Sequence, residues 1–149
     1  MSTGAQPGAS GGGGSKVLAY SEITANVTIS ANAEASATLI VQTAALTLDG
    51  ASAIMVEFFW PGVGVAQNEY ISLGIFEDGN PRGGNTFYST TSTGNNLTLP
   101  GVIKRRLTPA AGSHVYSARG YRQINNTTLL AGTGAAGQNA PAFIMVTSL

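Results

Sequence analysis

Residues 69–84 read EYISLGIFEDGNPRGG, and this stretch decides the fold class. The apolar side chains of Ile71, Leu73 and Ile75 alternate with the residues between them, so they lie on one side of an extended chain. A period of two is typical of a β-strand with one buried face. Gly, Asp, Asn and Pro then cluster over residues 78–84, which predicts a turn.

The same β texture extends from Lys16 to the end of the chain. Residues 23–30 (ITANVTIS) alternate again, and residues 53–60 (AIMVEFFW) form a short apolar run. Only residues 34–46 (EASATLIVQTAAL) could form a helix, but their β-branched side chains lose rotamer freedom there. We therefore predict an all-β protein with about eight to ten antiparallel strands in a sandwich or barrel.

The N-terminal segment differs in composition from everything that follows. Residues 1–15 are rich in Gly and Ser and predict a flexible arm, which leaves residues 16–149 as one domain. The glycine run before Ser15 and Lys16 is not a phosphate-binding loop. That motif places Gly directly before Lys and lies between a strand and a helix.

Composition excludes several classes of protein. Lys and Arg number 7 and Asp and Glu number 7, so a formal net charge of zero predicts neither nucleic-acid binding nor attraction to a membrane surface. The chain has no cysteine, which removes disulfides and thiolate sites. No apolar run approaches the roughly 20 residues that span a bilayer, and no signal peptide is recognisable. We expect a soluble protein made in the cytoplasm.

A large neutral surface is expected to promote association. Charged residues make up 9% of the chain, against about 25% in ordinary soluble domains. Such a surface favours contact with copies of the same chain or with a host assembly, although a stable monomer rich in Thr and Asn would have a similar composition.

The chemistry-bearing residues do not form a catalytic pattern. His114 is the only histidine, and the serines beside it lie in no nucleophile elbow. The acidic pair Glu77 and Asp78 has only Asn80 as a further possible calcium ligand, so we favour a solvated turn. No two carboxylates are marked as a glycosidase pair. The sequence predicts no enzyme, no metal site and no cofactor.

Residues 107–123 (LTPAAGSHVYSARGYRQ) predict a turn that leads into a strand. Pro109 and Gly112 mark the turn, and we expect Gly112 to adopt a positive φ. His114 would begin the strand as a polar residue that contributes modest packing or a single hydrogen bond.

Charge is distributed unevenly along the chain. Every acidic residue precedes Gly79, and six of the seven basic residues follow it. The best candidate for a partner-binding patch is Lys104, Arg105 and Arg106, although three consecutive residues of a strand do not all face one side. The alternative is that distant strands interleave, so that late cations pair with early carboxylates.

The order of segments from Val17 to Leu149 resembles tailed-bacteriophage virion proteins with a jelly-roll domain of the tumour-necrosis-factor and C1q-like kind. The resemblance rests on four segments: VLAYSEI (17–23), LTLDGASAIMVEFFW (46–60), TPAAGSHVYSARGYR (108–122) and LLAGTGAAGQNAPAFIMVTSL (129–149). It implies a jelly-roll β-sandwich, usually trimeric, that decorates a capsid or belongs to a tail or fibre. The N-terminal arm lacks Gly at every third position and is no collagen repeat.

Two functions follow from these observations. The first is a non-enzymatic virion protein, a homotrimer that binds the major capsid protein or another virion protein and stabilises the capsid surface. The second is a tail or fibre-tip module that binds a host-surface glycan, with Trp60, Tyr88 and Tyr121 as stacking platforms. Both place the protein in the virion after assembly in the host cytoplasm.

Overall fold

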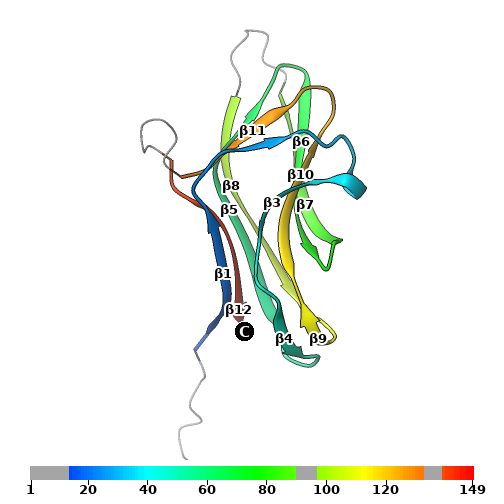
Figure 1. Cartoon of the computed structure of the whole chain (residues 1–149), viewed down its shortest axis with the longest axis vertical. Helices are drawn as coiled ribbons and strands as arrows, with labels where there is room; N and C mark the ends of the chain where they lie inside the picture. Colours follow the sequence, from blue (N-terminus) through cyan, green and yellow to red (C-terminus); the bar gives the residue numbers. More distant parts are fainter. Residues whose placement is uncertain (1–13, 90–96, 133–138) are drawn as a thin grey trace, which may run out of the picture.

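The computed structural model describes residues 14–89, 97–132 and 139–149 (Figure 1). The elements are β1 (Val17–Ile23), β2 (Val27–Ile29), the 3-10 helix η1 (Glu34–Ser36), β3 (Thr38–Gln42), β4 (Leu46–Asp49), β5 (Ile54–Val65), β6 (Glu69–Glu77), β7 (Asn80–Ser89), β8 (Leu97–Leu107), β9 (Ala111–His114), β10 (Tyr116–Arg122), β11 (Thr127–Leu130) and β12 (Ala142–Ser148). The arm predicted over residues 1–15 falls almost wholly outside the described residues. In the ranges above, no helix is long and apolar enough to cross a membrane.

The strands form two main sheets that face each other (Figure 1). One, here the β5 sheet, contains β1, β12, β5 and β8 in that order, with β11 and β2 beside the far end of β5. The other, the β6 sheet, has the order β3-β10-β6-β7. Strands β4 and β9 form a separate two-stranded ribbon, and every pairing is antiparallel.

The chain passes repeatedly from one sheet to the other, as a jelly-roll β-sandwich requires. It leaves the β5 sheet after β5, runs through β6 and β7, and returns with β8; β10 and β12 then repeat the crossing. The predicted fold class is confirmed. The described residues contain twelve strands, two more than the upper expectation, and β2, β4, β9 and β11 among them have only 3 or 4 residues each.

The core lies between the sheets and follows the alternation seen in the sequence. Ile71, Leu73 and Ile75 of β6 are buried against Phe58 and Trp60 of β5. Burial of large apolar side chains is the main stabilising contribution to such a fold. The polar Nε1–H of the buried indole donates a hydrogen bond to the carbonyl oxygen of Leu99 at 2.9 Å.

The turn after β6 is tighter than the sequence suggested. Asp78 and Gly79 both have positive φ, 51° and 81°, as in the Asp-Gly turns that connect antiparallel strands. The predicted turn cluster over residues 78–84 is therefore wrong beyond Gly79, because Asn80 already begins β7. Pro81 is tolerated in this strand because β7 is the edge of its sheet.

Candidate functional site

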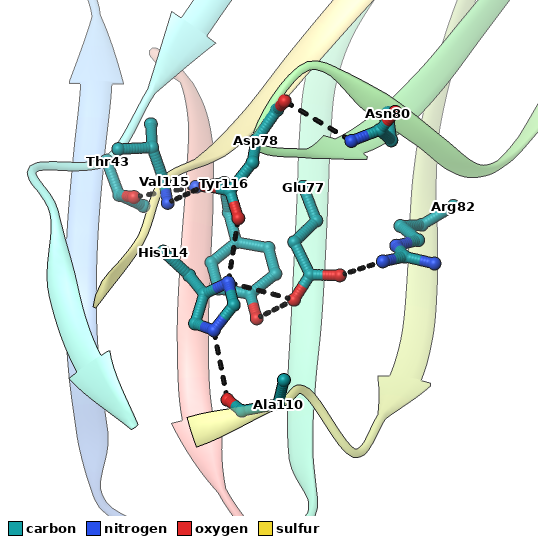
Figure 2. A network of polar contacts seen from close by, with 9 residues as sticks. All are labelled: Thr43, Glu77, Asp78, Asn80, Arg82, Ala110, His114, Val115 and Tyr116. Atoms are coloured by element: carbon teal, nitrogen blue, oxygen red, sulfur yellow. Dashed lines mark hydrogen bonds and ion pairs between the residues drawn. The ribbon is translucent and has the colours of Figure 1, made fainter. Parts of the chain in front are cut away.

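A network of polar side chains lies where the β6–β7 turn meets the end of β9 (Figure 2). The Nδ1 atom of His114 lies 2.7 Å from Oδ2 of Asp78 and 3.5 Å from Oε1 of Glu77. Its Nε2 atom lies 3.0 Å from the carbonyl oxygen of Ala110. The buried hydroxyl of Tyr116 donates to Glu77 Oε1 at 2.8 Å, and Arg82 pairs with Oε2 of the same carboxylate at 2.5 Å.

These contacts set the protonation of the network. The hydrogen bond to Asp78 raises the pKa of His114. The backbone N–H of Val115 and the imidazole of His114 together lower the pKa of Asp78, despite partial desolvation. Burial, and then the hydrogen bond to Glu77, raise the pKa of Tyr116, so this phenol stays neutral. Each oxygen of the Glu77 and Asp78 carboxylates already has a donor. The network therefore holds the β6–β7 turn against the end of β9.

His114 differs in two respects from its expected role. It ends β9 instead of beginning a strand, because β10 starts at Tyr116. The expectation of a single hydrogen bond is also wrong, since the ring has three polar neighbours. Sequence reasoning missed the contact with Asp78 because that residue lies 36 positions away in the chain. The positive φ expected at Gly112 is confirmed at 136°.

The outer face of the β5 sheet carries an apolar cluster, here called the aromatic face (Tyr20, Phe59, Val102 and Phe143). The ring of Phe143 lies 5.5 Å from that of Tyr20 and 5.4 Å from that of Phe59. Val102 is the register partner of Phe59 on the edge strand β8. Tyr20 is 50% exposed and Val102 is 46% exposed, so much of this cluster is open in the single chain.

The three cations at residues 104–106 do not form one patch. Lys104 faces outward beside the aromatic face and pairs with Glu57 at 2.8 Å. Arg105 is the register partner of the fully buried Val56, so it lies on the opposite side of β8 and passes over Gly83 at the edge of the sandwich. The expected alternation along a strand is observed. The ion pair of Lys104 with Glu57 also joins a basic residue of the second half of the chain to an acidic residue of the first half, as in the alternative interpretation of the charge distribution.

The outer face of the β6 sheet contains a hollow of about 160 Å³, here called the glycine hollow. Its floor is the row formed by Gly74 of β6 and Gly84 of β7, which are register partners. Arg119 of β10 is the partner of Gly74 on the other side and closes one end. Two adjacent glycines leave the middle of this face without side chains.

The rows on either side of the glycines form the walls of the hollow. One wall contains Tyr121, Ser72 and Thr86, which are successive partners across β10, β6 and β7. The hydroxyls of Ser72 and Thr86 are 2.7 Å apart and hydrogen bonded. The other wall contains Phe76 and Pro81, also register partners.

The three aromatic residues predicted to stack on a glycan occupy different environments. Tyr121 is half-buried and lines the glycine hollow. Tyr88 is 57% exposed on the same face, two residues beyond Thr86 in β7. Trp60 is wholly buried between the sheets, so the prediction of a stacking platform is wrong at this position. An apolar run does not reveal which of its aromatic residues face the core.

Comparisons with known proteins do not assign any of these surfaces. No protein-family model matches the sequence, and no curated protein matches it. Three features of the described residues bear on function: the aromatic face, the glycine hollow and the polar network of Glu77, Asp78, Arg82, His114 and Tyr116, here called the His114 network.

Proposed function

We propose that this protein is a non-enzymatic structural protein of a tailed-bacteriophage virion, a homotrimer that decorates the capsid and stabilises it. The observation that carries the self-association is the aromatic face. Exposed apolar clusters on a folded domain mark surfaces that bind other proteins. The jelly-roll fold and the resemblance of four segments to phage virion proteins support the virion assignment.

A second copy of the chain fits the aromatic face by its charge as well as its apolar character. The charged groups beside it are already compensated, because Glu57 pairs with Lys104 and Glu22 accepts a hydrogen bond from Tyr20. The whole chain has a net charge of zero, so copies do not repel one another. Arg106 follows two residues after Lys104 on the same face, where it can meet the capsid protein at the rim.

The trimer is tested with a matched pair of substitutions on the two outer faces. Val102→Glu places a charge in the aromatic face, whereas Leu39→Glu places one on the outer face of the β6 sheet. The two side chains are 46% and 44% exposed and both lie in edge strands. In light scattering we expect a trimer for the wild type and for Leu39→Glu, and a monomer for Val102→Glu.

Two results would contradict self-association through this face. One is a wild-type protein that stays monomeric at every concentration. The other is a Val102→Glu variant that remains a trimer. The number of copies in purified particles tests the location separately, since a decoration protein covers the shell in many copies and a tail-tip protein is present in few.

A further inference from the structure

We propose that the glycine hollow binds a single sugar ring that carries a carboxylate, such as a uronic acid or a sialic acid. This site lies on the opposite face of the sandwich from the aromatic face, so it does not depend on how the protein self-associates. Its groups come from three neighbouring strands and η1, and each group has a counterpart in the chemistry of an acidic sugar.

The size and floor of the hollow suit one flat ring. At about 160 Å³ it is smaller than the roughly 300 Å³ at which sites for drug-sized ligands begin. Because Gly74 and Gly84 carry no side chains, a ligand can approach the backbone of the sheet directly. A pyranose ring can lie on this floor, whereas a bulkier group meets the walls.

Arg119 supplies the preference for a carboxylate. Its guanidinium carbon lies 5.5 Å from the centre of the Phe76 ring, and its Nε donates to the hydroxyl of Ser117 at 3.2 Å. These contacts fix the plane of the guanidinium. Neither of its terminal nitrogens has a hydrogen-bond or ion-pair partner among the described residues, so both are available for a bidentate contact with a carboxylate.

The other walls offer the partners that sugar hydroxyls and ring faces require. The hydroxyls of Ser72 and Thr86 can donate and accept hydrogen bonds. Tyr121 offers an aromatic ring at the wall opposite Phe76. Glu34 of η1 also lines the hollow, and a negative charge there disfavours ligands with several negative charges.

Titration followed by protein NMR tests the site with defined probes. The probes are glucuronic acid and N-acetylneuraminic acid, with glucose as the neutral control and acetate as the control for charge alone. We expect at least one acidic sugar to shift the amide signals of β6, β7 and β10, with an affinity at least tenfold above those of glucose and acetate. Comparison of the two acids then identifies the class of glycan.

Two variants locate the binding, and a third controls for charge. Arg119→Gln should reduce the affinity for the acidic sugar at least tenfold, to the level of glucose. Arg106→Gln removes a cation from the outer face of the β5 sheet and should leave the affinity unchanged. Gly74→Ala adds a methyl group at the floor, 3.3 Å from the carbonyl oxygen of Gly83 and 3.4 Å from the Phe76 ring, and should weaken every sugar.

The proposal is overturned if neither acid binds, or if acetate or glucose binds as tightly as the acids. It is also overturned if Arg119→Gln keeps the wild-type affinity. Should Arg119→Gln fail to fold, Gly74→Ala decides, because a folded Gly74→Ala variant with unchanged affinity places the sugar elsewhere.

Discussion

Two buried carboxylates lie at opposite ends of strand β6, and they are satisfied in different ways. Glu69, 1% exposed, begins the strand and accepts hydrogen bonds from the backbone N–H groups of Gln123, Ile124 and Asn125 at 2.7 to 2.8 Å. Glu77, 4% exposed, ends the strand, and its partners are the side chains of the His114 network.

The difference decides how each end of the sandwich responds to pH. Burial raises the pKa of the Glu69 carboxyl, but the three backbone N–H groups and nearby Arg122 outweigh this and lower it below its usual value. Backbone N–H groups do not titrate, so the hydrogen bonds of Glu69 persist through the neutral pH range. The other end includes His114, whose raised pKa brings a titration into that range.

The largest effect is expected when the backbone-bonded carboxylate is removed. Glu69→Ala leaves three N–H groups of the loop after β10 without their acceptor, and a hydrogen bond to a charged group contributes more than a neutral one. We expect the free energy of unfolding to fall by about 3 kcal/mol in chemical denaturation, since water replaces part of what is lost. The control is Glu34→Ala, which removes an exposed carboxylate. Equal effects of the two substitutions would show that Glu69 does not hold the loop.

Tyr116→Phe tests the side-chain end of β6 with the smallest possible change. The ring remains packed, but Glu77 loses the hydroxyl that donates to it at 2.8 Å. A buried hydrogen bond to a charged group contributes about 1.5–3 kcal/mol, and we expect a loss in the lower half of that range because Arg82 and His114 remain. Tyr88→Phe, at an exposed position, is the control in the same denaturation experiment. A loss as large as that of Glu69→Ala would remove the distinction between the two ends.

Gly112→Val tests how far the His114 end depends on backbone conformation. Gly112 has φ of 136°, and a Cβ there would meet no atom within 4 Å, so the expected cost comes from the backbone conformation and not from a clash of the Cβ. Residues with a Cβ reach this region at a cost of about 1–2 kcal/mol, and we expect that loss of unfolding free energy. Thermal unfolding measures it. An unchanged melting temperature would mean that the β4–β9 ribbon adjusts its backbone.

The strands could be predicted because their signals are local, whereas the jelly-roll arrangement was implied by the resemblance. The alternation of Ile71, Leu73 and Ile75 and the Asp78–Gly79 dipeptide predict a strand and its turn without knowledge of any neighbour. The length of β7 was missed because Pro81 and three glycines suggest a loop, whereas Pro is compatible with an edge strand.

The candidate sites could be predicted only in part, because they depend on which strands become neighbours. Tyr121 was singled out as an aromatic residue, but the hollow beside it exists because Gly74 and Gly84 are register partners. The pairing of His114 with Asp78 likewise joins residues from β9 and the β6–β7 turn. No spacing along the chain encodes that approach.

The smallest expected effect is the pH dependence of the stabilisation that His114 contributes, and it is also the sharpest test of the difference between the two ends of β6. Its pKa is raised in the folded protein, so its contact with Asp78 contributes fully below the ordinary value of about 6.5 and is lost as the pH rises through the raised value. Because the pKa values of Asp78 and Glu69 are lowered, these carboxyl groups change the unfolding free energy only at acidic pH and do not contribute to the slope near neutral pH. The unfolding free energy of the wild type should therefore fall from pH 6 to pH 8.5, as measured by denaturation at each pH.

His114→Gln should flatten this slope, and Glu69→Ala should retain it, because the backbone-bonded carboxylate has no partner that titrates near neutrality. His114→Gln should accordingly cost more at pH 6 than at pH 8.5. A cost that is equal at the two pH values would mean that the imidazole acts only through its shape and its contact with Ala110. The two ends of β6 would then respond to pH alike, even though one carboxylate is bound by backbone and the other by side chains.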